Sequence, residues 1–200
     1  NNITWIGVSG GGVSKYDQNV TQFGLWRNET ISGKAQPDNM ILSMYSQNDE
    51  DFYLGTLNGG LLHTNVKTNE SNYYEPPSGK NNKTESKNIY SIIKGNKNEL
   101  WMATWGGLCS FDTKTKQMKL YNDSDEKTIQ LSALIKLEKE NKILVGGNKM
   151  RLRLFDLNTL TWQPIKDPEN VITGKEFRVR YMHALNEDEI LLSSEVVNLC

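Results

Sequence analysis

The chain has 200 residues, of which 36% are hydrophobic and 24% are charged, and its net charge is −1. This near-neutral balance, with Lys and Arg residues scattered along the chain, excludes the basic field that nucleic-acid-binding proteins present. No apolar stretch reaches the roughly 18 residues of a membrane helix. The first residues read as a strand rather than a secretory signal, so the N-terminus is expected to be a cut end. Cys109 and Cys200 follow no metal-binding spacing, and the sequence implies neither a metal nor a cofactor.

A motif made of a short apolar run, a small residue and a glycine-rich link recurs along the whole chain. The first copy is Trp5–Asp17, the second is Tyr53–Leu61, and the third and most regular is Trp101–Asp112. Weaker fourth and fifth copies begin at Leu144 and Leu191. Because internal repeats define an architecture, the period of this motif predicts the fold.

The small residue of the motif sets the period. Its successive copies lie 48, 48, 43 and 47 positions apart, at Gly7, Gly55, Ala103, Gly146 and Ser193. Repeats of about 40 to 50 residues are typical of β-propeller blades, and no segment shows the 3.6-residue period that helical repeats need. The sequence therefore predicts an all-β protein whose blades each contain four antiparallel strands.

Each period contains four strand-like runs separated by turn-rich links. In the third period the second run is apolar at every position from Leu100 to Ala103, which indicates burial on both faces, as in a sheet packed between two others. The predicted organisation is a partial blade, three full blades and a second partial blade, at 1–28, 39–77, 88–122, 129–166 and 177–200.

The two partial blades leave two architectures open. Residues 1–24 would supply strands two to four of a blade, and residues 177–200 would supply strands one and two. Joining them would close a four-bladed ring, the smallest of the usual range, and would leave residues 190–200 over. We expect instead an open fragment of a larger propeller of about seven blades.

The best copies of the motif resemble a known repeat. The string LWMATWGGLCSFD at 100–112 is similar to the two-component regulator propeller repeat, whose typical form is L-W-I-G-T-x-x-G-G-L-x-x-[FY]-[DN]. The copy TWIGVSGGGVSKYD at 4–17 matches almost as well, whereas the copy at 52–65 ends on His63-Thr64-Asn65 instead of an aromatic–Asp pair. The resemblance covers nearly the whole chain.

This resemblance carries an expected function. In that family the repeats form the periplasmic sensor region of membrane-anchored hybrid two-component histidine kinases, typically of saccharolytic Gram-negative bacteria. Many of these sensors detect oligosaccharides released from complex glycans. The resemblance thus implies a non-catalytic sensing segment that takes an oligosaccharide, works within a homodimer and has its kinase domain outside these residues.

Candidate ligand-binding residues lie where the copies differ, because variation on a repeated frame is how repeat proteins place binding chemistry. Trp105, in the link after the second strand, could stack on a sugar ring or pack over the neighbouring blade. Asn58, Lys149 and Arg151 could supply hydrogen bonds and charge to a ligand or form solvated loops. Arg180, on a first strand expected to line the channel, could contact an anion or pair with a carboxylate.

Catalysis finds little support in the sequence. His63 and His183 fit no metal-ligand spacing. Asp17, Asp112 and Asp156 recur at one repeat position, which indicates turn formation rather than paired catalytic carboxylates. Two other classes stay open. A propeller lyase or glycan-active enzyme would need convergent His and carboxylate side chains, and a protein-binding scaffold would need a large exposed apolar patch.

Overall fold

The computed structural model describes residues 3–8, 12–17, 20–26, 40–77, 87–122, 130–148, 152–165, 177–186 and 189–196. Within these ranges the chain forms seventeen β-strands and no α-helix. The same ranges therefore offer no helix long and apolar enough to span a bilayer. The predicted all-β architecture is confirmed.

Three sheets have four antiparallel strands each, hydrogen-bonded in chain order. Sheet 2 consists of β4 (Ile41–Ser46), β5 (Asp51–Thr56), β6 (Leu61–Asn65) and β7 (Glu70–Tyr74). Sheet 3 consists of β8 (Ile89–Lys94), β9 (Glu99–Thr104), β10 (Gly107–Asp112) and β11 (Met118–Tyr121). Sheet 4 consists of β12 (Leu131–Leu137), β13 (Lys142–Gly147), β14 (Arg153–Asp156) and β15 (Thr161–Pro164).

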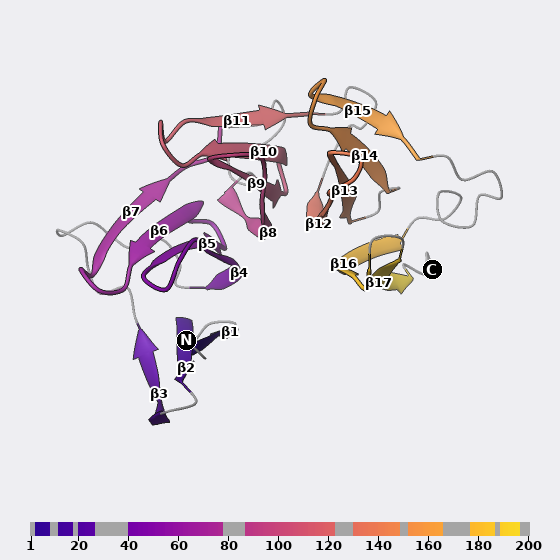
Figure 1. Cartoon of the computed structure of the whole chain (residues 1–200). Helices are drawn as coiled ribbons and strands as arrows, with labels where there is room; N and C mark the ends of the chain where they lie inside the picture. The colour runs from indigo at the N-terminus through magenta and orange to yellow at the C-terminus, as the bar shows by residue number, and fades with distance from the viewer. Residues whose placement is uncertain are drawn as a thin grey trace.

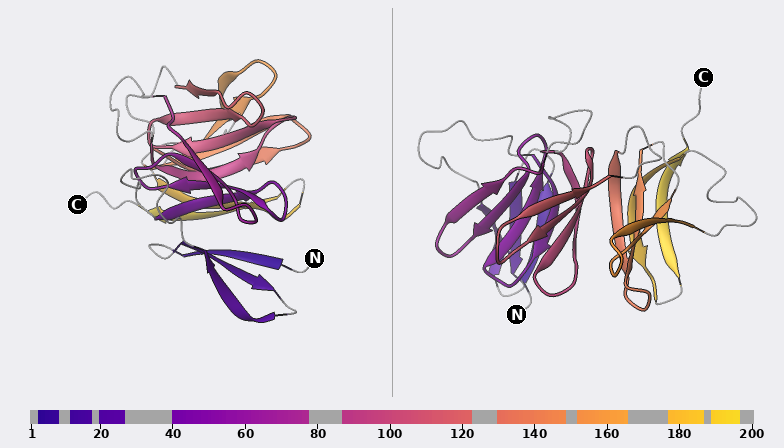
Figure 2. Two further views of the ribbon diagram at one scale, coloured as in Figure 1. Left: turned by 90° about the vertical axis from the view of Figure 1, so that its left-hand side faces the viewer. Right: turned by 90° about the horizontal axis from the view of Figure 1, so that it is seen from above.

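Two smaller sheets lie at the ends of the chain. Sheet 1 consists of β1 (Ile3–Val8), β2 (Gly12–Asp17) and β3 (Val20–Trp26), and sheet 5 of β16 (Phe177–Ala184) and β17 (Ile190–Val196). The two do not join into one sheet, so the four-bladed ring is not formed. The five sheets instead follow an open arc, with β4, β8, β12 and β16 along its inner side (Figure 1). Figure 2 shows the sheets stacked face to face around this arc.

Strand β9 contributes to two different hydrophobic cores, because alternate residues of a strand point to opposite faces. Trp101 and Ala103 pack with residues of sheet 4, including Phe155. Leu100 and Met102 pack with residues of sheet 2. All four side chains are buried, so the predicted burial of both faces of this strand is confirmed.

In sheets 2 to 4 the small residue of the repeat packs closely on the next sheet, whereas a Cβ atom on Gly7 of sheet 1 would meet nothing within 4 Å and Ser193 of sheet 5 is exposed. A Cβ atom on Gly55 would lie 2.6 Å from the carbonyl oxygen of Ile89, in the first strand of the next sheet. A Cβ atom on Gly146 would lie 2.8 Å from Cβ of Val179, again in the next first strand. Ala103 occupies the same position in sheet 3 and is fully buried. Only small side chains fit there.

The first strands of sheets 2 to 5 each carry a β-bulge opposite that small residue. The register shifts between Ile41 and Ser43 in β4, and equivalent shifts occur in β8, β12 and β16. Each bulge leaves one extra residue without a cross-strand partner and bends the strand locally. These four residues are Leu42, Tyr90, Ser132 and Arg180.

The turn between the third and fourth strands is built by one side chain. Oδ1 of Asp112 accepts hydrogen bonds from the backbone N–H groups of Lys114 and Thr115, both at 2.8 Å. Asp156 makes the same two bonds in sheet 4, and Asn65 makes them in sheet 2. The predicted turn function of the recurring Asp is confirmed at these two aspartates, while the side chain of Asp17 lies outside the described residues.

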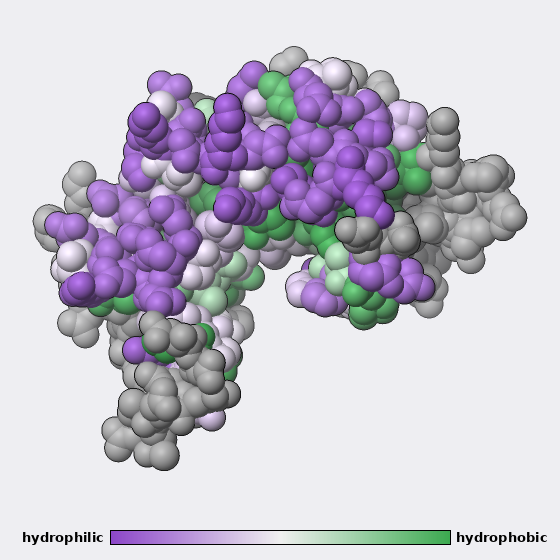
Figure 3. Space-filling view, in the orientation of Figure 1, coloured by the Kyte–Doolittle hydropathy of each residue, from purple (hydrophilic) through white to green (hydrophobic). Residues whose placement is uncertain are grey.

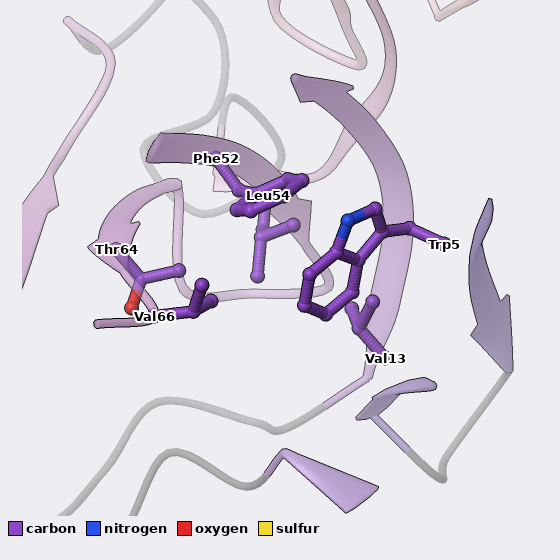
Figure 4. A pocket seen from close by; sticks show the side chains of 6 residues that line it. All are labelled: Trp5, Val13, Phe52, Leu54, Thr64 and Val66. Atoms are coloured by element: carbon purple, nitrogen blue, oxygen red, sulfur yellow. The ribbon is translucent and has the colours of Figure 1, made fainter. Parts of the chain in front are cut away.

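A small apolar gap lies between sheets 1 and 2, beside Trp5 (Figure 4). The Trp5 ring is half-buried and its centroid lies 4.5 Å from that of Phe52. The gap measures about 10 Å³, which is barely the space of one water molecule, and its walls are almost entirely apolar. It is a packing defect between two sheets and not a ligand site.

Candidate functional site

A cavity lies on the inner side of the arc. Its volume is about 470 Å³, within the range of small-molecule sites. Figure 3 shows hydrophobic residues gathered along this concave side, whereas the outer side is mainly hydrophilic. The walls come from the first strands of sheets 2 to 5, at 42–44, 90–93, 132–135 and 180–183.

The bulges contribute one residue from each sheet to the lining of this cavity. All four extra residues, Leu42, Tyr90, Ser132 and Arg180, are among its lining. They lie at the same level of the repeat, each just before the residue that pairs with the small position. The bulge positions therefore add one aliphatic, one aromatic, one hydroxyl-bearing and one cationic residue to the other residues of the four first strands.

Trp105 is not among the residues that line the cavity, but it stacks on Tyr90, which is. It is half-buried in the link between β9 and β10, and its ring stacks on that of Tyr90 with centroids 5.3 Å apart and an interplanar angle of 15°. The link lies beside the start of β8 because antiparallel strands bring those ends together. Trp105 thus packs on the first strand of its own sheet, and the pair forms an aromatic platform at the cavity wall.

Positive charge lies across the cavity from this platform. Arg180 is exposed and lines the cavity, while Nε of Arg178 donates to Oδ1 of Asn148 at 2.9 Å. Burial raises the pKa of Tyr90, and the charges of Arg180 and Arg178 act against that rise. The two arginines of sheet 5 are therefore near enough for Tyr90 of sheet 3 to experience their field.

Of the three other predicted site residues, the structure describes only Asn58. Asn58 is exposed in the link after β5 with a φ of 62°, and its backbone N–H donates to Oδ1 of Asn88 at 2.7 Å. Asn88 directly precedes β8, so Asn58 lies at the same end of the sheets as the Tyr90 platform. Lys149 and Arg151 lie outside the described residues.

Sequence reasoning missed Leu42, Tyr90 and Ser132. A signal does exist once the first strands are aligned on their bulges. Each then reads as an apolar residue, a variable residue, and a residue that pairs with the small position, as in Ile89-Tyr90-Ser91. The variable residue lines the cavity in all four sheets, but its position can be recognised in the sequence only once the place of the bulge is known.

One further titratable pair, His63 and Asp51, lies in sheet 2. His63 Nε2 lies 3.3 Å from Asp51 Oδ1, and the Asp51 carboxylate also accepts hydrogen bonds from Asn48 and Asn65. The Asn48 bond is the main cause that lowers the pKa of Asp51, and burial lowers the pKa of His63. This cluster lies in sheet 2 outside the cavity lining. Within the described ranges no three His, Cys, Asp or Glu side chains gather as a metal site.

No protein-family model and no curated protein sequence matches the chain. Among solved structures, it is similar to the extracellular domain of BT3049 from B. thetaiotaomicron, described as a hybrid two component system, with a TM-score of 0.71 and 19% identity over 95% of this chain. It is also similar to the extracellular domain of BT4673 from the same organism, described as a one component system, with a TM-score of 0.55 and 17% identity over 96%.

The chain spans 26% and 30% of the lengths of those two structures. At such identities the likeness shows the fold, and it agrees with the predicted propeller blades. Both neighbours are extracellular domains of signalling systems, in agreement with the repeat family that the sequence resembles.

Proposed function

We propose that this chain is a segment of a periplasmic ligand-sensing propeller, and that its ligand is an oligosaccharide bound on the concave side of the arc. The parent protein would be a membrane-anchored hybrid histidine kinase that works as a homodimer. The observation that carries the proposal is the cavity of about 470 Å³ that the first strands of four sheets line together. The fold likeness to extracellular domains of signalling proteins supports the same function.

The composition of the cavity suits a sugar. Pyranose rings have an apolar face that packs on aromatic rings, and the Tyr90–Trp105 platform offers such a surface. The hydroxyl groups of a sugar need hydrogen-bonding partners, which Arg180 can supply. The hydroxyl of Ser132 already donates to the carbonyl oxygen of Val179, so it can only accept from a ligand. The cavity extends over four first strands, so it is long enough for more than one sugar unit.

Signalling follows from differential binding. A ligand that contacts several sheets at once stabilises the arrangement of sheets that fits it best. This shift can reach an output domain only if that domain is coupled to the same two arrangements. The segment itself would then bind and move but perform no chemistry.

The test is calorimetric titration of the complete extracytoplasmic region with a panel of glycan fragments, for the wild type and for Trp105→Ala. We expect one fragment to bind, and Trp105→Ala to weaken it about threefold to tenfold through loss of stacking. Lys114→Ala, in the exposed turn at the other end of sheet 3, is the matched control and should bind normally. Binding that Trp105→Ala leaves unchanged would place the ligand elsewhere, and no binding of any glycan would refute the oligosaccharide assignment.

A further inference from the structure

One face of sheet 5 is exposed next to the cavity. Its residues are two from β16 and their cross-strand partners in β17, namely Tyr181, His183, Ser193 and Leu191. The opposite face is buried, since Met182 packs on sheet 4. Two of the exposed residues, Tyr181 and His183, also line the cavity, so this face continues the wall that the first strands form.

Tyr181 does not follow the pattern of the other sheets. The residue that pairs with the small position is Ser43 in sheet 2, Ser91 in sheet 3 and Ala133 in sheet 4. In sheets 2 and 4 this position belongs to the contact between sheets, because the Ser43 hydroxyl donates to the carbonyl oxygen of Ile89 at 2.8 Å and Ala133 is buried against sheet 5. A tyrosine ring would not fit a contact of that kind. Tyr181, which is 62% exposed, is therefore suited to a role outside the contacts between sheets.

His183 departs from the pattern too. The equivalent residues of the other first strands are apolar or aromatic and pack on the next sheet: Tyr45, Ile93 and Ile135. His183 is polar and exposed. Its ring is nearly parallel to that of Tyr181, with an interplanar angle of 11° and centroids 6.4 Å apart. Sheet 5 therefore presents two aromatic rings to solvent where the other sheets hold contact residues.

The cavity thus has an aromatic surface at two of its walls. Sheet 3 contributes the Tyr90–Trp105 platform, and sheet 5 contributes Tyr181 with His183 beside it. Sheet 4 lies between them, and stacked sheets are about 10 Å apart face to face. The two aromatic surfaces are therefore too far apart for a single sugar ring to contact both.

We propose that Tyr181 forms a second sugar-stacking surface, and that the ligand is a linear oligosaccharide of at least three units. The inference rests on the proposed function and adds the minimum length of the ligand. One unit stacks on the Tyr90–Trp105 platform, the next passes the first strand of sheet 4, and the third stacks on Tyr181. Aromatic rings suit this role because they bury a large apolar area. Two contacts on one ligand reinforce each other, since the second forms at a high effective concentration.

Oligosaccharide ladders test this length requirement. Cello-, malto- and galacto-oligosaccharides of two, three and four units are titrated calorimetrically into the complete extracytoplasmic region. Any other panel glycan that binds is added as a ladder of its own fragments. We expect the trisaccharide of a binding ladder to bind at least about fivefold more tightly than the disaccharide, because only the trisaccharide reaches both aromatic surfaces.

The deciding variant is Tyr181→Ala. It should weaken the trisaccharide about threefold to tenfold and leave the disaccharide, which occupies the Tyr90–Trp105 platform, unchanged, whereas Trp105→Ala should weaken both. Tyr181→Phe keeps the ring and should bind every length like the wild type. Leu191→Ala is the matched control, because Leu191 is 56% exposed on the same face but lies outside the described cavity lining. That control should also bind like the wild type, and circular dichroism should show that all the variants are folded.

The possible failures are distinguishable. Equal binding of disaccharide and trisaccharide, or a trisaccharide affinity that Tyr181→Ala leaves unchanged, would overturn the second surface while the oligosaccharide function stands. If that variant instead dissociates an oligomer in sedimentation velocity, the face is a protein interface. A loss in Leu191→Ala as large as that in Tyr181→Ala would assign the effect to a disturbed sheet 5 and overturn the role of Tyr181. If no glycan of the ladders or the panel binds, the proposed function itself fails, and the inference fails with it.

Discussion

The first two strands of sheets 3 and 5 pair in the same register but differ in what covers them. In sheet 3, Trp101 pairs with Ile93 in the first strand and is fully buried against sheet 4. In sheet 5, Leu191 pairs with His183 at the same register position and is 56% exposed. The opposite faces of both sheets are packed, since Met102 and Met182 are buried against the preceding sheets.

This difference shows that a strand of this repeat does not determine its own burial. The core of the arc lies between sheets, so each hydrophobic cluster needs two sheets to form. Repeat architectures behave in this way because their stability is a sum of contacts between nearest neighbours. An equivalent substitution should therefore have a large effect where the next sheet is present and a small one where it is absent.

The largest effect is expected from Trp101→Ala. Removing this buried ring leaves a cavity between sheets 3 and 4 and should destabilise the chain by about 3–5 kcal/mol. Leu191→Ala, at the equivalent position of sheet 5, should change stability by less than about 0.5 kcal/mol because most of its side chain already contacts solvent. Denaturant titrations of both variants of this chain measure the contrast. Equal losses would mean that sheet 5 is covered in solution.

A smaller effect is expected at the small position of the repeat. Ala103→Leu adds three heavy atoms to a fully buried site between sheets 3 and 4 and should cost about 1–3 kcal/mol through overpacking. Ser193 is exposed at the same position of sheet 5, so Ser193→Leu should cost less than about 0.5 kcal/mol. The denaturation midpoints of the two variants, each compared with the wild type, measure this difference. An unchanged midpoint for Ala103→Leu would show that the space between sheets 3 and 4 can accommodate a larger side chain.

Much of the fold could be predicted from the sequence. The period predicted the sheets, and the apolar run at 100–103 predicted burial on both faces. The small residue predicted close approach between sheets correctly at Gly55, Ala103 and Gly146, but not at Gly7, which nothing approaches within 4 Å. These features can be recognised in the sequence because each requires side chains of a particular size or polarity. The turn at Asp112 is similar, since a side chain that caps its own backbone must be Asp, Asn or a close equivalent.

The site was harder to predict because it includes β-bulges, which depend on how strands pair and not on residue type. A bulge is one extra residue in one strand, and strand-like alternation over five or six residues cannot show where it falls. Tyr90 was consequently not identified, and Trp105 was considered without the ring on which it stacks. Arg180 was expected on a channel-lining strand, but the sequence did not reveal that its position matches those of Leu42 and Ser132 in other sheets.

The smallest effect on stability is expected from Asp112→Asn. This variant tests whether the turn at the rim of sheet 3 contributes less to the stability of the fold than the core between sheets does. Two backbone N–H groups, those of Thr115 and Lys114, hold the pKa of Asp112 below its ordinary value of 3.8. A lowered pKa in the folded state stabilises the fold above the ordinary value, and this contribution is lost as the pH falls through the folded pKa. Asn keeps an oxygen that accepts the same two bonds, as Asn65 does in sheet 2, but it carries no charge.

The difference in denaturation midpoint between the wild type and Asp112→Asn should therefore be small and constant above about pH 5, and should shrink below about pH 4 as the carboxylate of the wild type is protonated. Asp112→Ala, which removes both hydrogen bonds, is the control and should be less stable than Asp112→Asn at every pH. A wild type whose advantage over Asp112→Asn grows on acidification would reverse the sign of the pKa shift. The carboxylate would then not be the form that the turn stabilises, and the recurrence of Asp in sheets 3 and 4 would need a different cause.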